Sequence, residues 1–104
     1  MIRQAIKLTI VTERLLLKEI IRVIEAAGAS GYTVTPASGK GSKNLRSSGD
    51  PMVSDTYANV RIEVITTEPE MSERIANEIG EKFFENFSGI IYRDQVEVLR
   101  AHWL

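Results

Sequence analysis

The stretch Asn59-Val60-Arg61-Ile62-Glu63-Val64-Ile65-Thr66 alternates apolar with polar side chains over most of its length. Successive side chains of a β-strand point to opposite faces of the sheet. Val60, Ile62 and Val64 would therefore lie on one buried face, and the charged residues between them on the other. We predict a strand over residues 59–66.

A long polar segment precedes this strand. From Ser38 to Tyr57 about twenty residues show no periodic apolar pattern, and connections longer than about 12–15 residues are usually functional or disordered. The segment opens with Gly39-Lys40-Gly41-Ser42-Lys43-Asn44-Leu45-Arg46-Ser47-Ser48-Gly49, a run of glycines, cations and hydroxyls. Accessible backbone amides, hydroxyls and clustered cations are the parts of a phosphate-binding loop. A solvated loop that is basic by chance is the alternative, and the spacing matches neither a Walker A motif nor a dinucleotide-binding fingerprint.

The N-terminal region predicts a strand and a helix. Residues 5–12 alternate aliphatic with polar side chains, which is typical of a strand with one buried face. Thr12 is then a candidate N-cap for an amphipathic helix over residues 13–27. Gly28 would end this helix as a C′ residue, because glycine tolerates the left-handed conformation found there.

A second helix is predicted after the strand over residues 59–66. Thr67 and Glu70 have the spacing of a capping box, and Pro69 would lie in the first turn, where a missing N–H costs nothing. Gly89 would end the helix. Apolar residues recur every four positions along its buried stripe, at Met71, Ile75, Ile79 and Phe83.

Two further strands complete the prediction. Residues 31–35 are rich in β-branched and aromatic side chains, and Pro36 would restrict the far end of this strand to an edge of the sheet. Residues 90–92 and 96–99 predict a last strand, with a possible break near Arg93-Asp94.

The predicted order is β, α, β, long loop, β, α, β. That order is typical of the ferredoxin-like βαββαβ fold, an α+β arrangement with two helices on one face of an antiparallel sheet. Several strands carry adjacent apolar residues, such as Ile10 with Val11 and Val64 with Ile65, which is more than one buried face needs. The second face would therefore pack against other subunits, so we predict a homo-oligomer of one domain over residues 1–104.

Composition excludes several classes of protein. The chain has 13 basic and 14 acidic residues, which is not the strongly basic balance of a general nucleic-acid binder. It has no cysteine and a single histidine, His102, so we expect neither a disulfide framework nor a metal cluster. No run of 18 or more apolar residues and no signal peptide is visible, and we expect a cytoplasmic protein.

The chain resembles the SbtB family of PII-like carbon-sensing signalling proteins, which are associated with a sodium-dependent bicarbonate transporter in cyanobacteria. The resemblance covers most of the sequence and rests on Leu8-Thr9-Ile10-Val11-Thr12-Glu13, Gly28-Ala29-Ser30-Gly31-Tyr32-Thr33-Val34, Gly39-Lys40-Gly41-Ser42 with Asn44, Arg46, Ser47, Ser48 and Gly49, and Gly89-Ile90-Ile91-Tyr92. It implies a homotrimer with cyclic AMP, AMP, ADP or ATP bound as effector ligands in the clefts between subunits, and no tightly bound cofactor. It also implies a T-loop at about residues 39–58 that docks on the transporter at the membrane periphery, within a carbon-concentrating mechanism.

The resemblance also assigns the nucleotide site. The residues that match the loop-base segment facing the phosphates are Lys40, Gly41, Ser42, Arg46 and Ser47, and Gly39 and Lys43 belong to the same run. Gly89 and Ile90 match the backbone that lines the adenine side of the cleft. Lys43 stands where better-known relatives have arginine, so a compact ammonium replaces a bidentate guanidinium. No catalytic residue and no metal ligand is assigned.

A slow phosphohydrolase of ATP or ADP is the alternative to a non-catalytic nucleotide sensor. Metal-assisted hydrolysis needs carboxylates beside the phosphates and a positioned base. Asp50 and Asp55 in the long segment and Glu63 in the predicted strand are the available acids, but their spacing is that of ordinary solvated residues. We therefore expect binding without catalysis.

Overall fold

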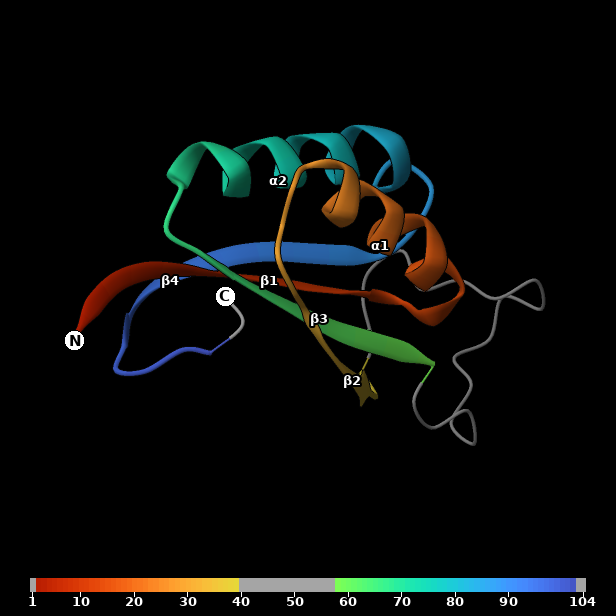
Figure 1. Ribbon diagram of the computed structural model, residues 1–104. Coiled ribbons are helices and arrows are strands. Elements are labelled where there is room, and N and C mark those ends of the chain that lie inside the picture. Colours follow the sequence, from red (N-terminus) through yellow and green to blue (C-terminus); the bar gives the residue numbers. More distant parts are fainter. Residues whose placement is uncertain (1, 40–57, 103–104) are drawn as a thin grey trace.

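The computed structural model describes residues 2–39 and 58–102. These residues form one four-stranded antiparallel sheet with two helices on one of its faces (Figure 1). In chain order the elements are β1 (Arg3–Glu13), the short 3-10 helix η1 (Arg14–Leu16), α1 (Leu17–Ala26), β2 (Thr33–Ala37), β3 (Asn59–Thr66), α2 (Pro69–Phe83) and β4 (Gly89–Val98). The strand order is β2-β3-β1-β4, which confirms the predicted ferredoxin-like α+β fold.

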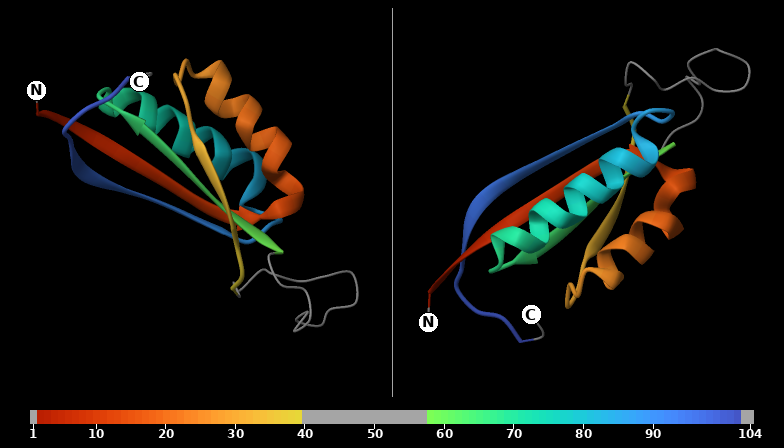
Figure 2. Two further views of the ribbon diagram at one scale, coloured as in Figure 1. Left: turned by 60° about the horizontal axis from the view of Figure 1, so that its bottom comes forward. Right: turned by 90° about the horizontal axis from the view of Figure 1, so that it is seen from above.

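The core lies between the helices and the sheet. Both helices cover the same face: the right view of Figure 2 has them in front of the sheet, and the left view has the sheet in front of them. Alternate residues of the central strands β1 and β3 point toward the helices, as the period of two requires. The largest buried apolar side chains are Leu8, Ile10, Ile20, Ile24, Ile62, Val64, Ile75 and Ile79. The predicted strand over residues 59–66 and its buried face are confirmed.

The start of the first helix differs from its prediction. Thr12 is not an N-cap, because β1 continues to Glu13 and pairs Thr12 with Val60 and Gly89 on its two sides. The chain then enters η1, whose N-cap residue Glu13 makes no side-chain capping bond. The end of the helix is as predicted, since Gly28 has a φ of +94°.

The start and end of α2 also differ from their predictions. The N-cap is Glu68 and no side chain caps the helix, so the capping box of Thr67 with Glu70 is wrong. Instead, the Glu68 N–H donates to Thr66 Oγ1 at 3.0 Å. Pro69 is the first helical residue, as predicted. The helix ends at Phe83, and Gly89 is already the first residue of β4 because it pairs with Thr12.

The outer strands are more regular than expected. β4 runs without a break through Arg93 and Asp94, because the two side chains point to opposite faces. Arg93 Nη1 donates to Ser72 Oγ on α2 at 2.8 Å, whereas Asp94 lies 3.8 Å from Lys7 Nζ on the bare face. β2 pairs only with β3, which confirms the predicted edge position, but the strand covers Thr33–Ala37 instead of residues 31–35 and includes Pro36.

The sheet face without helices carries a mixture of apolar and charged side chains. Ile90 is 57% exposed and Tyr92 is 44% exposed, and both lie on this face of β4. Large exposed apolar side chains on an uncovered sheet are consistent with the predicted packing between subunits. Among the described helices, none has the length and hydrophobicity required to span a membrane.

Candidate functional site

The sheet has two ends, and one of them collects the predicted site residues that the structure describes. Ala37 pairs with Asn59, Asn59 pairs with Glu13, and Gly89 pairs with the neighbouring Thr12. The end of β2, the start of β3, the end of β1 and the start of β4 therefore lie in one row. We call this row, with Gly39 beside it, the loop end of the sheet.

Three of the nine predicted site residues fall within the described ranges. Gly39 is exposed at the end of β2, and its carbonyl accepts a hydrogen bond from Asn59 Nδ2 at 3.2 Å. Gly89 and Ile90 are exposed at the start of β4. The structure thus brings Gly39, Gly89 and Ile90 to the same end of the sheet. The other six, Lys40, Gly41, Ser42, Lys43, Arg46 and Ser47, lie outside the described residues.

Gly89 has a packing role as well as its predicted place in the site. A Cβ atom built on Gly89 would overlap the ring of Phe84, the residue that follows the last turn of α2. The ring can therefore close over the start of β4 only because residue 89 has no side chain. The same lack of a side chain leaves the backbone of Gly89 accessible to a ligand.

Buried polar groups connect the strands at the loop end. Thr12 Oγ1 donates to the Ser88 carbonyl at 2.7 Å, and the Ser88 N–H donates to Glu13 Oε2 at 2.8 Å. The Arg14 N–H donates to the carbonyl of Ala58, just before β3, at 2.8 Å. Sequence reasoning missed these contacts, because the partners Thr12 and Ser88 are 76 positions apart. The only signal was a pair of polar residues that ends an otherwise alternating strand.

The opposite end of the sheet is hollow. A cavity of about 530 Å³ opens there between the two ends of the described chain, the turn after α1 and the turn before α2. We call this region the cavity end. Its lining residues are Arg3, Ala5, Gly28, Ala29, Ser30, Ile65, Thr66, Thr67, Glu68, Met71, Val98, Leu99, Arg100 and Ala101. No sequence pattern indicated it, because four separate segments form it.

The chemistry of the cavity suits a ligand with an apolar and an anionic part. Ile65, Met71 and Val98 supply half-buried apolar surface, and Arg3 and Arg100 supply two exposed cations. The volume is within the range of small-molecule sites, which is about 300–1,000 Å³. Within residues 2–39 and 58–102, no group of three or more side chains could bind a metal ion.

The two ends are too far apart for one small ligand to contact both in a single chain. β4 has ten residues between Gly89 at the loop end and Val98 at the cavity end, and a strand rises about 3.3 Å per residue, so the separation is about 30 Å. Figure 1 shows the start of β1 at one end of the sheet and the start of β3 at the other.

Comparisons with known proteins agree with this architecture. The chain has 36% sequence identity to a PII-like signalling protein from Thermus thermophilus, covering 93% of this chain and 91% of that one with a TM-score of 0.73. It has 26% identity to CPII from Thiomonas intermedia in a structure with ADP and bicarbonate bound, covering 96% and 93% of the two chains with a TM-score of 0.75. A further CPII structure, with ADP, AMP and bicarbonate, has 25% identity over 98% and 100% of the two chains, and its TM-score is 0.75.

The family assignment rests on a match over almost the whole chain. Residues 5–102 match the model of the family described as nitrogen regulatory protein P-II. The match includes every described strand and helix except the first two residues of β1. This chain therefore belongs to the nitrogen regulatory protein P-II family.

Proposed function

We propose that the protein is a signalling protein that binds adenine nucleotides in clefts between the subunits of a homotrimer. The observation that carries the proposal is the position of Gly39, the first residue of the Gly-Lys-Gly-Ser run, at the same end of the sheet as Gly89 and Ile90. Membership of the P-II family and the structures of CPII with ADP and AMP support it. The nucleotide acts as an effector, so no tightly bound cofactor is required.

The two ends of the sheet supply complementary halves of such a cleft. At the loop end, Gly39, Gly89 and Ile90 offer accessible backbone for the adenine side. Lys40, Gly41, Ser42, Lys43, Arg46 and Ser47 supply amides, hydroxyls and cations for the phosphates. At the cavity end of the neighbouring subunit, apolar surface and the cations Arg3 and Arg100 complete the cleft. The separation of about 30 Å within one chain is the reason for assigning the halves to different subunits.

The finer assignment within the family is to the SbtB group. The supporting features are the Gly-Tyr-Thr-Val and Gly-Lys-Gly-Ser motifs at their separation in this sequence. We propose that residues 39–58 act as a T-loop, that nucleotide binding changes how this loop docks, and that the partner is a sodium-dependent bicarbonate transporter. The protein would then be cytoplasmic and peripheral to the membrane when docked. A nucleotide can shift docking only as far as it binds the two loop states with different affinity.

Calorimetric titration of cyclic AMP, AMP, ADP and ATP, with and without bicarbonate, tests the nucleotide proposal. Arg46→Ala is expected to weaken binding by about 1.5–3 kcal/mol, the range for a lost hydrogen bond to a charged group. Arg74→Ala removes an exposed arginine from α2 and serves as the matched control, with unchanged affinity. Absence of binding for all four nucleotides would refute the proposal.

Mixed oligomers test the assignment of the two halves to different subunits. Arg46→Ala damages the loop half and Arg100→Ala damages the cavity half. If the halves come from neighbouring subunits, random co-assembly of the two variants restores about a quarter of the sites to full affinity. If both halves came from one subunit, every site in the mixture would stay damaged.

The hydrolytic alternative gains no support from the described residues. Glu63 lies on the bare face of β3, 3.7 Å from Arg61, whereas Asp50 and Asp55 lie outside the described ranges. A phosphate-release assay with purified protein and ATP separates sensing from hydrolysis.

A further inference from the structure

Two consecutive residues at the end of β1 hold both backbone groups of Ser88. Thr12 Oγ1 donates to the Ser88 carbonyl at 2.7 Å, and Glu13 Oε2 accepts from the Ser88 N–H at 2.8 Å. Thr12 is 2% exposed, Glu13 4% and Ser88 9%. Water therefore cannot readily replace either bond. We call this pair of bonds the Ser88 clamp.

The clamp determines the orientation of the backbone at Gly89. The carbonyl of Ser88 and the N–H of Gly89 belong to the same peptide group, which is planar. A bond from Thr12 to that carbonyl therefore also sets the direction of the Gly89 N–H. Glu13 holds the preceding peptide through the Ser88 N–H. The two bonds together leave the Ser88-Gly89 segment little freedom to rotate.

The side chain of Ser88 has no part in the clamp. Ser88 Oγ is buried and has no hydrogen-bond partner among the residues that the structure describes. The segment is thus held by its backbone, through side chains that come from β1. The turn contributes only its peptide groups, so the position of Gly89 depends on Thr12 and Glu13.

Glu13 is buried, and one of its carboxylate oxygens accepts the Ser88 N–H. A hydrogen bond from a backbone N–H to a carboxylate is stronger than one between neutral groups. Glu13 also stands at the N-cap position of η1 without capping it. Its carboxylate is directed across to the α2–β4 turn instead.

The same short segment also contacts the base of the long loop. The Arg14 N–H donates to the Ala58 carbonyl at 2.8 Å, and Asn59 Nδ2 donates to the Gly39 carbonyl at 3.2 Å. Residues 12–14 therefore connect the turn before β4 with Ala58, and Asn59, which pairs with Glu13, extends the connection to Gly39. Hydrogen bonds from side chains of β1 and β3 thus fix both Gly39 and the peptide before Gly89.

We propose that Thr12 and Glu13 are positioning residues of the nucleotide site, which act by orienting the Ser88-Gly89 peptide for the adenine side of the cleft. This inference rests on the proposed function. Neither residue needs to touch the nucleotide. Their substitution weakens binding because the Gly89 backbone no longer has one orientation before the ligand arrives, and the ligand must then order it.

Isosteric substitutions test the clamp. Thr12→Val keeps the shape of the side chain and removes its donor, and we expect about tenfold weaker nucleotide binding, with Thr12→Ser restoring affinity to within about twofold. Glu13→Gln keeps one acceptor oxygen and is expected to weaken binding about threefold. Calorimetry would be performed well below the melting temperature of each variant. The amide NMR signals of Ser88 and Gly89 in the free protein report whether the clamp is intact.

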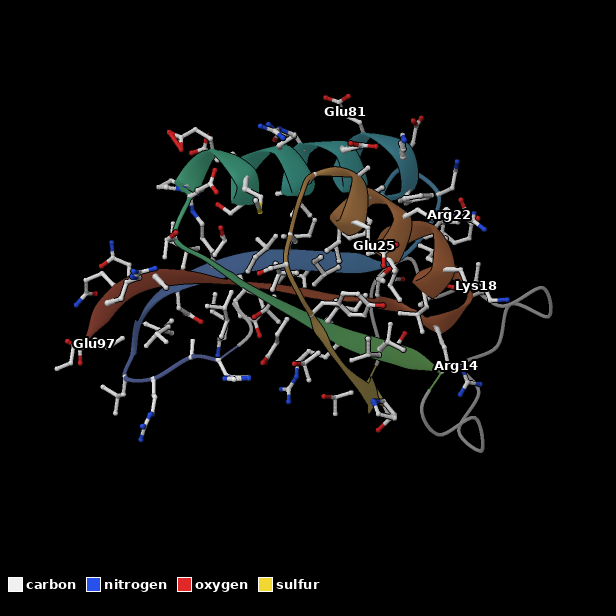
Figure 3. The ribbon with its side chains drawn as sticks, in the orientation of Figure 1. Arg14, Lys18, Arg22, Glu25, Glu81 and Glu97 are labelled. Carbon is white, nitrogen blue, oxygen red and sulfur yellow. The ribbon has the colours of Figure 1, made fainter. Side chains whose placement is uncertain are left out.

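Two controls separate positioning from general loss of stability. Ser72→Ala removes a buried hydroxyl that donates to the Pro69 carbonyl at 2.7 Å, the same length as the Thr12 bond, from a part of α2 away from the loop end. Glu81→Gln removes the charge of an exposed glutamate on the outer side of α2 (Figure 3). Both controls are expected to bind nucleotide within about twofold of the wild type.

The outcomes are distinguishable. If the wild type binds and Thr12→Val and Glu13→Gln bind equally well, the clamp has no positioning role and the inference is overturned. Thr12→Ser binding as weakly as Thr12→Val would overturn it too, because the hydroxyl would then not matter. If Thr12→Val does not fold, the test rests on the other two variants. Weaker binding by Glu13→Gln together with near-normal binding by Thr12→Ser would support the inference, and unchanged binding by Glu13→Gln would overturn it. A wild-type protein that binds no nucleotide overturns the proposed function first, and this inference with it.

Discussion

The two ends of the sheet are built in different ways. At the loop end, buried polar side chains from β1 and β3 hold the neighbouring turn and the last described residues before the loop. At the cavity end, the chain leaves about 530 Å³ of open space with two exposed arginines at its lining. The loop end therefore has a backbone fixed by hydrogen bonds, and the cavity end has space for a small molecule. The proposed cleft between subunits uses this difference, because it assigns the orientation of the nucleotide to the loop end and its enclosure to the cavity end.

A glycine can be substituted at each end to test this difference, Gly89 at the loop end and Gly28 at the cavity end. The larger loss of stability is expected for Gly89. Gly89→Ala places a methyl group against the ring of Phe84. We expect the free energy of unfolding to fall by about 2–3 kcal/mol, because the ring or the turn must move. Urea denaturation at a fixed protomer concentration measures it, since the stability of an oligomer depends on concentration.

The Phe84→Ala background provides the control for this substitution. Without the ring, the added methyl group should cost much less, giving a coupling energy of about 1–2 kcal/mol in a double-mutant cycle. An equal cost in both backgrounds would show that Gly89 is required for some other reason than space for Phe84.

At the cavity end, Gly28 is required for its conformation and not for space. Its φ is +94°, and the nearest heavy atom to an added Cβ is Met71 Cε at an ordinary 3.9 Å. Gly28→Ala is expected to cost about 1–2 kcal/mol of unfolding free energy, the penalty of a left-handed conformation for a residue with a Cβ. Gly28→Asn should cost less, because asparagine tolerates this region better.

Shortening the side chain nearest to Gly28 should not reduce the cost of Gly28→Ala, whereas removing the Phe84 ring should reduce the cost of Gly89→Ala. Met71→Ala is expected to leave the cost of Gly28→Ala unchanged within about 0.5 kcal/mol in chemical denaturation, because the two changes share no steric overlap. A rescue as large as that expected for Phe84→Ala would mean that the two glycines have the same role.

The smallest effect is expected for the side chain that the loop end does not use. Ser88→Ala removes a buried hydroxyl without a described partner and keeps both backbone groups in the clamp. We expect a change in unfolding free energy within about 0.5 kcal/mol, with a gain in stability as the favoured direction. Nucleotide affinity should not change. A tenfold loss of affinity in calorimetry would show that the hydroxyl itself contributes to the site.

Much of the fold follows from local patterns in the sequence. The alternation in residues 59–66 gave the bounds of β3, and Gly28 gave the end of the first helix. Two of the errors occurred where a distant partner overrides a local rule. Thr12 has the local appearance of an N-cap, but its hydroxyl finds the carbonyl of Ser88 across the sheet. Gly89 has the appearance of a helix end, but it pairs with β1.

The candidate site was predictable only in part for the same reason. The resemblance to the SbtB family placed Gly39 and Gly89 in one site, and the sheet register with the Asn59–Gly39 bond brings both to one end. The phosphate side of the prediction, Lys40 to Ser47, stays a prediction. The cavity could not be predicted, because residues as far apart as Arg3, Met71 and Arg100 form it together and none belongs to a recognisable motif.

The proline in β2 affects how the molecule avoids aggregation. β2 is one edge of the described sheet, and Pro36 lies inside the strand. It has no N–H to offer to a strand of another molecule, so this edge is a poor template for adding one. β4, the other edge, has ten residues without a proline or a break. Unwanted strand addition, in a crowded or partly unfolded sample, should therefore begin at β4.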